Sequence, residues 1–145
     1  MAIPKTYKVV AVIFIALFAL ILYKSIAMTK VNVSDITDAT ITFVYCDKNI
    51  NEKLTSEEAE TLKSIVNGKR LFEDQPACGF SPDISFSFGN MIFSVANDTC
   101  EIIKFETTHG KHKRKATDMY LFVTEQEKQK IYDVFNKYGG FFPCV

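Results

Sequence analysis

Residues 83–96, which read DISFSFGNMIFSVA, decide the fold of this chain. Before Gly89-Asn90, apolar residues alternate with serine, as in Ile84-Ser85-Phe86-Ser87, and after it Met91, Phe93 and Val95 recur at alternate positions. An alternation of period two is typical of strands that pack one face on a core and expose the other. Gly89-Asn90 has the length and composition of a two-residue hairpin turn. The stretch therefore predicts an antiparallel hairpin.

More strands are expected on both sides of this hairpin. Runs rich in β-branched and aromatic residues occupy 39–46 (ATITFVYC), 100–107 and 119–123. A further short strand is expected within 69–74 (KRLFED), around residues 70–73. Residues 47–54 are polar and residues 75–83 contain two prolines and a glycine, so both segments are expected to be loops.

Two helices are predicted from the same starting signal. Thr55 precedes Glu58 by three residues and Thr124 precedes Glu127 by three, which is the capping-box spacing. Apolar residues then recur at helical spacing, and the glycines at 68 and 139–140 follow as stop signals. The expected fold class is α+β, a small antiparallel sheet packed with two helices on one face, in the order β-α-β-β-β-β-β-α.

The N-terminus carries an apolar run. Residues 9–22 read VVAVIFIALFALIL, and Lys5 and Lys8 precede them. As a helix this run is about 21 Å long, whereas the apolar core of a membrane is about 30 Å thick. The run alone is therefore short for a span, although an N-terminal apolar run behind lysines is typical of a membrane-directing segment.

Two interpretations of this segment stay open. In the first, the helix continues to residue 28 with Tyr23 and Lys24 at the interface, and residues 1–28 are a transmembrane signal anchor in the N-in/C-out orientation. In the second, Ser25-Ile26-Ala27 is a cleavage site and the mature chain is secreted. Residues 29–38 are then a linker, and residues 39–145 form an extracytoplasmic domain.

Four cysteines follow the apolar run, at Cys46, Cys78, Cys100 and Cys144. No C-x-x-C motif is present, and an even number in a small exported domain predicts two disulfides. Three connectivities are possible. The predicted hairpin brings Cys78 and Cys100 to the same end, which favours a Cys78–Cys100 bridge and leaves Cys46 to pair with Cys144.

The charged residues argue against nucleic-acid binding. Lysine plus arginine and aspartate plus glutamate each number 17, and residues 28–145 hold 14 basic and 17 acidic residues, a net charge of −3. Nucleic-acid binders are usually strongly basic. One basic loop follows His109, and its candidate residues for an anionic partner are Lys111, Lys113, Arg114 and Lys115. His109 and His112 have H-x-x-H spacing, but the surrounding cations disfavour a bound metal.

No catalytic residue, metal site or cofactor is predicted, because the sequence contains no G-x-S-x-G motif and no glycine-rich phosphate loop. The expected function is a membrane-tethered, noncatalytic binding or accessory module that meets a protein or an anionic surface. The alternative is a secreted small enzyme or inhibitor, released by cleavage after Ala27.

Overall fold

The computed structural model describes residues 5–27, 30–108 and 118–144. The chain divides into two compact units, Met1–Lys30 and Val31–Val145. The first unit contains helix α1, Lys5–Ala27. Along residues 10–23 of this helix, every side chain is exposed. No helix within the described ranges is long and apolar enough to cross a membrane, so the structure gives the predicted span no support.

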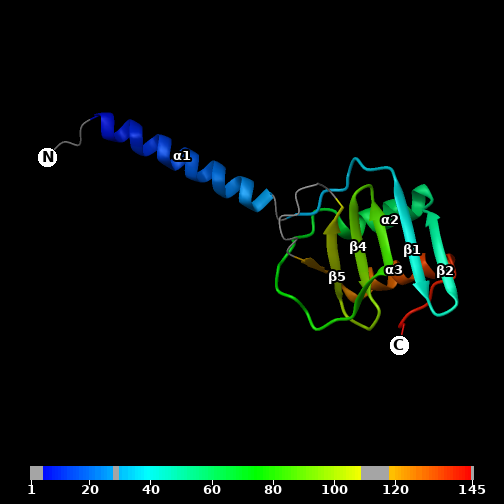
Figure 1. Ribbon diagram of the computed structural model, residues 1–145. Helices are drawn as coiled ribbons and strands as arrows, with labels where there is room; N and C mark the ends of the chain where they lie inside the picture. The colour runs from blue at the N-terminus through cyan, green and yellow to red at the C-terminus, as the bar shows by residue number, and fades with distance from the viewer. Residues whose placement is uncertain (1–4, 28–29, 109–117, 145) are drawn as a thin grey trace. The chain divides into compact units, whose positions relative to one another are not determined.

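The second unit is an α+β domain built on a six-stranded antiparallel sheet (Figure 1). Its strands follow the order β2-β1-β3-β4-β5-β6 across the sheet. The bounds are β1 Ala39–Tyr45, β2 Lys48–Lys53, β3 Phe80–Phe88, β4 Met91–Ala96, β5 Ile102–Thr107 and β6 Met119–Phe122. Every neighbouring pair is antiparallel, which confirms the predicted sheet type.

The central hairpin forms where the sequence predicts it. Phe88 pairs with Met91 across a two-residue turn in which Gly89 has a φ of 56°. Because a Cβ disfavours positive φ, glycine suits this position. The register then aligns Phe86 with both Ile41 and Phe93, which places large apolar side chains on one face of three strands. The serines between them lie on the opposite face.

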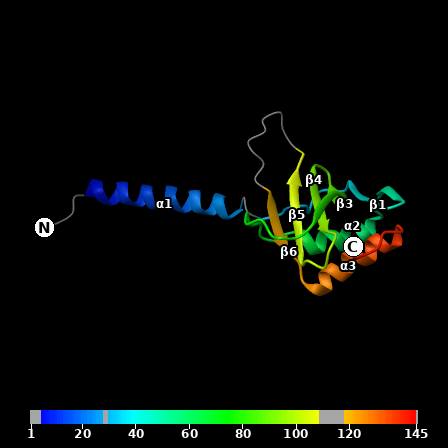
Figure 2. The same cartoon turned by 60° about the horizontal axis from the view of Figure 1, so that its bottom comes forward.

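Helices α2, Ser56–Val66, and α3, Glu125–Lys137, cover the apolar face of the sheet (Figure 2). Both capping boxes are formed, with Thr55 and Thr124 accepting from the backbone N–H three residues later. Each helix turns an apolar stripe toward the sheet. The most completely buried side chains come from both layers: Ile41, Phe43, Leu62, Ile84, Phe86, Phe88, Phe93, Ile103, Leu121, Ile131 and Phe135.

Two local expectations about strands need correction. Residues 48–53, expected within a loop, form β2, because the turn at Cys46 and Asp47 folds them back along β1. Residues 69–74 do not form a strand: Arg70 and Phe72 are isolated bridge residues, and Phe72 pairs with Tyr120. The tertiary partner decides both cases, since a polar edge strand has no periodic apolar signal.

The predicted linker also differs from the structure. Val31 and Val33 are buried in the core, and the Val31 N–H donates to the Lys69 carbonyl at 3.0 Å. The Val33 N–H donates to the Asn67 side chain, also at 3.0 Å. Alternating valines in a polar segment bury one side of an extended chain, so residues 31–38 belong to the domain.

Candidate functional site

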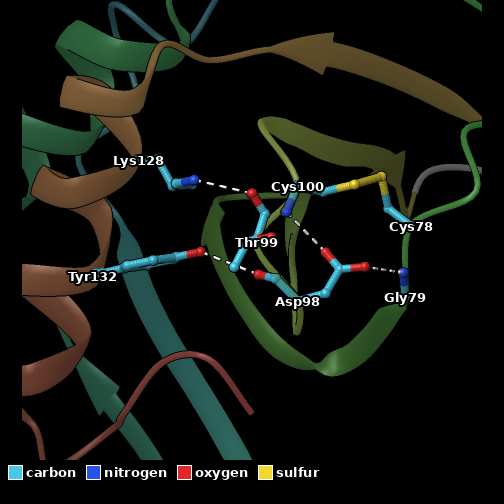
Figure 3. The surroundings of a disulfide bond; sticks show 7 residues. All are labelled: Cys78, Gly79, Asp98, Thr99, Cys100, Lys128 and Tyr132. Atoms are coloured by element: carbon cyan, nitrogen blue, oxygen red, sulfur yellow. Dashed lines mark hydrogen bonds between the residues drawn. A yellow bond between two sulfur atoms is a disulfide. The ribbon is translucent and has the colours of Figure 1, made fainter. Parts of the chain in front are cut away.

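The disulfide Cys78–Cys100 is formed, with 6.1 Å between the two Cα atoms. This confirms the pairing expected from the hairpin. It joins the segment before β3 to the segment before β5 (Figure 3). Asp98 lies beside it and accepts from the backbone N–H groups of Gly79 and Cys100, at 3.3 and 2.9 Å. Because both sulfurs are bonded and the carboxylate already has two donors, this cluster stabilises the loop.

Two side chains of α3 hold the same loop from the helix layer. The Lys128 ammonium donates a hydrogen bond to the Thr99 carbonyl at 2.9 Å, and the Tyr132 hydroxyl donates one to the Asp98 carbonyl at 3.3 Å (Figure 3). Burial is the main cause that raises the pKa of Tyr132 to about 12, so this phenol stays protonated and remains a donor. The loop that carries the disulfide is therefore hydrogen-bonded to α3 and connects the sheet with this helix.

The second predicted bridge is not formed in this structure. Cys46 and Cys144 are free thiols, the first exposed and the second buried. The basic residues proposed for an anionic partner, Lys111, Lys113, Arg114 and Lys115, lie outside the described residues, as do His109 and His112.

The most distinctive surface of the domain lies at the β6 edge of the sheet. Here the ring of Phe72 stacks on the ring of Phe122 with 4.5 Å between their centroids. Tyr120 lies beneath, 5.8 Å from Phe72 and 5.7 Å from Phe80 by the same measure. Phe122 is nevertheless 61% exposed. An exposed aromatic ring at a sheet edge marks a candidate site for an apolar contact.

A shallow groove of about 560 Å³ opens at these rings. Its walls are formed by Arg70, Leu71, Phe72, Asp74 and Phe122. Arg70 and Asp74 are exposed and carry opposite charges, whereas Leu71 is buried. The groove therefore combines an apolar floor with one positive and one negative side chain.

The backbone of β6 adds hydrogen-bonding groups to this groove. The Val123 N–H donates to the Glu101 carbonyl of the neighbouring chain segment. The N–H and C=O of Tyr120 and Phe122, three residues and one residue earlier, therefore point away from β5. The Tyr120 N–H donates to the Phe72 carbonyl at 2.8 Å, and the Phe72 N–H donates to the Tyr120 carbonyl at 2.9 Å. The N–H and C=O of Phe122 have no hydrogen-bond partner among the residues that the structure describes. The edge therefore offers a donor and an acceptor next to the exposed ring.

The opposite edge of the sheet differs in chemistry. Strand β2 reads KNINEK, and five of its six residues are exposed. Charged residues on an edge strand discourage pairing with another chain. Strand β6 reads MYLF and has no charged residue. Only the β6 edge thus lacks the charges that usually block strand addition.

Charged groups border the aromatic surface, one cation with two carboxylates, and add a net negative charge. Lys104, opposite Tyr120 in the register, contacts Glu106 and Asp118, both at 3.3 Å. Burial lowers the pKa of Lys104, but hydrogen bonds and charges from the two carboxylates outweigh it, so the net shift is upward. The ammonium therefore stays charged and paired.

The sequence predicts a strand at 119–123, but it does not predict that this strand borders an exposed aromatic surface. A signal for the surface was available in the sequence, since the five consecutive apolar residues at 119–123 do not alternate with polar ones. One face of such a strand needs cover from elsewhere, and Phe72 and Phe80 supply it only for Tyr120. Comparison of the chain with protein-family models, with curated proteins and with solved structures found no match.

Proposed function

We propose that residues 31–145 form a noncatalytic binding module whose β6 edge receives an extended strand of a partner protein. The stack of exposed Phe122 on half-buried Phe72, beside unpaired backbone groups, carries this proposal. An added strand satisfies the N–H and C=O of Phe122 and directs alternate side chains to the groove. The rings then bury apolar area, which supplies most of the favourable free energy.

Charge indicates the composition of that strand. Arg70 and Asp74 border the groove, so a matching strand places an apolar residue on the rings and charged residues of opposite sign near each flank. Charge complementarity of this kind sets register and partner choice more than affinity. A nucleic acid fits poorly, because the described groove has no excess of positive charge.

The N-terminal unit completes the proposal. The apolar side chains along residues 10–23 of α1 are exposed, and an exposed apolar helix surface requires an apolar environment. We therefore propose that α1 directs the chain to a membrane, retained as an anchor or removed after Ala27. The Cys78–Cys100 bridge supports an oxidising compartment for the domain.

Selection from a library of random peptides tests the binding site. The full chain is immobilised and the selected peptides are assayed against Phe122→Ser and against Val44→Ser, a matched loss of an exposed apolar side chain on β1. We expect peptides with apolar residues at alternate positions, whose affinity falls at least about tenfold for Phe122→Ser and stays unchanged for Val44→Ser.

Three outcomes would reject the binding proposal. These are the absence of any selected peptide, equal binding to Phe122→Ser, and self-association of the free chain that Phe122→Ser abolishes. For the N-terminal unit, cell fractionation with N-terminal sequencing is the test. An intact chain in the membrane fraction or a mature chain beginning at Met28 agrees with the proposal, and an intact chain in the soluble fraction contradicts it.

A further inference from the structure

The two free cysteines lie in segments that are far apart in sequence. Cys46 is in the two-residue turn between β1 and β2, and its side chain is exposed. Cys144 lies next to the C-terminal residue and is only 3% exposed. The structure leaves both thiols unbonded, and neither has a part in the binding surface at β6.

Aromatic contacts hold these two segments together. The ring of Phe141 lies 5.6 Å from the ring of Tyr45 and 5.5 Å from that of Phe43, between centroids. The residues that lead into Cys46 therefore pack on a residue that leads into Cys144. Figure 1 shows the C-terminal segment beside the turn that joins β1 and β2.

Further contacts define the position of Cys144. Its backbone N–H donates to the Asn97 carbonyl at 2.8 Å, and its thiol donates to the Phe141 carbonyl at 3.1 Å. Burial raises the pKa of the Cys144 thiol, and the charge of Cys46 raises it further. The second effect agrees with the aromatic contacts, since charge acts on a pKa only from nearby.

The backbone at Cys46 is unusual as well. Its φ is 54°. Among the described residues other than glycine, Cys46 is the one with a positive φ. Positions of this kind in tight turns favour glycine or asparagine, because a Cβ makes the left-handed region unfavourable. A cysteine here keeps a thiol at the tip of the turn at the expense of backbone strain, which points to a use for that thiol.

We propose that Cys46 and Cys144 are a site of reversible oxidation, at which a second disulfide fastens the C-terminal segment to the β1–β2 turn. The oxidant is a low-molecular-weight disulfide such as oxidised glutathione. Each thiol loses its hydrogen, a sulfur–sulfur bond forms between the two residues, and the two electrons and two protons reduce the oxidant to two thiols. This inference is independent of the proposed binding function.

Exposure sets the order of the two steps. The thiolate of exposed Cys46 attacks the small disulfide first, which gives a mixed disulfide on Cys46 and releases one small thiol. The thiolate of Cys144 then attacks the Cys46 sulfur and releases the second small thiol. Buried Cys144 is protected from the first step, because access limits attack on the small disulfide.

The test uses the full chain in buffers of oxidised and reduced glutathione, with alkylation of remaining thiols and mass spectrometry. We expect the wild-type chain to lose both free thiols without a lasting glutathione adduct, and peptide mapping to link Cys46 to Cys144. Excess reduced glutathione should restore both thiols. The Cys144→Ser variant should instead accumulate the mixed disulfide on Cys46, and Cys46→Ser should keep Cys144 unmodified.

A lasting glutathione adduct on Cys46 of the wild-type chain, with Cys144 still a free thiol, would overturn the proposal. A bridge between two chains, recognised by its dependence on protein concentration, would also overturn it. Because the wild-type measurement alone distinguishes these results from an internal bridge, the test holds even where the buried Cys144→Ser variant fails to fold.

Discussion

The hydroxyl of Tyr138 donates a hydrogen bond of 2.6 Å to the carboxylate of Glu58. This contact joins the C-cap of α3 to the first turn of α2, through two residues that lie 80 positions apart in sequence. Glu58 also accepts from the Thr55 N–H at 3.1 Å, as the second half of the capping box. One buried carboxylate therefore caps one helix and fastens the end of the other.

Removal of the phenol hydroxyl in Tyr138→Phe should destabilise the domain. A hydrogen bond to a charged group contributes about 1.5–3 kcal/mol, and its loss leaves the Glu58 carboxylate with one donor fewer. Urea unfolding of the wild-type chain and the variant measures the change. Tyr23→Phe removes an equivalent hydroxyl from the exposed helix α1 and is the control, for which the free energy of unfolding should not change. Equal stability of Tyr138→Phe and wild type would contradict the prediction.

Stability should also fall in acid through Glu58. The Tyr138 hydrogen bond is the largest cause that lowers the pKa of Glu58 to about 2; burial opposes it and hydrogen bonds to Thr55 add to it. The usual value is 4.5. A carboxyl whose pKa is lower in the folded state stabilises the fold above the unfolded pKa and loses this effect as the pH falls through the folded pKa.

The Glu58→Gln variant isolates this effect. Its deficit in free energy of unfolding, measured against wild type, should be largest above a pH of about 4.5 and shrink as the pH approaches about 2. Urea unfolding over a series of pH values gives both curves. A deficit that stays constant over this range would show that the charge of Glu58 is not responsible.

Loss of the Cys78–Cys100 bridge should weaken the domain without rearranging the sheet. The two cysteines are separated by 22 residues, and closure of a loop of this size contributes about 3 kcal/mol through the unfolded chain. The double variant Cys78→Ser/Cys100→Ser should therefore unfold at lower urea concentration, under nonreducing conditions. Cys46→Ser, measured without added oxidant so that Cys46 and Cys144 of the wild-type chain stay thiols, is the matched control and should change little. Equal midpoints for the double variant and wild type would contradict the prediction.

A side chain at position 79 should force the side chain of Asn97 to move. A Cβ at position 79 would overlap the side-chain amide of Asn97, and the Asn97 N–H donates to the Gly79 carbonyl at 3.0 Å. Gly79→Ala should cost about 1–3 kcal/mol, as overpacking does. Adding Asn97→Ala should restore part of that loss, because the overlap disappears. A double-mutant cycle measures this coupling, and simple additivity would argue against the overlap.

Packing around Phe43 should contribute strongly to the stability of the domain. Its ring is fully buried and lies within 6.1 Å of the rings of Phe135, Phe141 and Phe142, between centroids. Phe43→Ala should therefore cost about 3–5 kcal/mol. The neighbouring Val44→Ala, on the exposed face of the same strand, should cost less than about 0.5 kcal/mol. Thermal or urea unfolding of both variants would reveal any reversal of this order.

Local signals predicted the elements that local interactions stabilise. The hairpin at 83–96 and the capping boxes at Thr55 and Thr124 depend on contacts within a few residues, and the structure contains all three. The Cys78–Cys100 bridge follows from the same hairpin, since paired strands bring its ends together. In these cases the periodicity and the turn residues carry enough information to predict the structure.

The elements that the sequence concealed depend on distant partners. Strand β2 is a polar edge that exists through pairing with β1, and the turn before it uses Cys46 in place of glycine. The candidate surface arises only when Phe72 bridges to Tyr120 and its ring stacks on Phe122, 50 residues later in the chain. No spacing in the sequence indicates such a contact.

The sequence by itself determined an apolar N-terminal segment, an α+β domain and one disulfide, because hydrophobic periodicity, turn residues and helix caps act over short distances. The tertiary structure alone decided which edge of the sheet remains open, which residue covers Tyr120 and which thiols stay unbonded. These features depend on the order in which strands pair across the sheet. Strand order is set by burial of the whole apolar face, a property that no short segment of the chain contains.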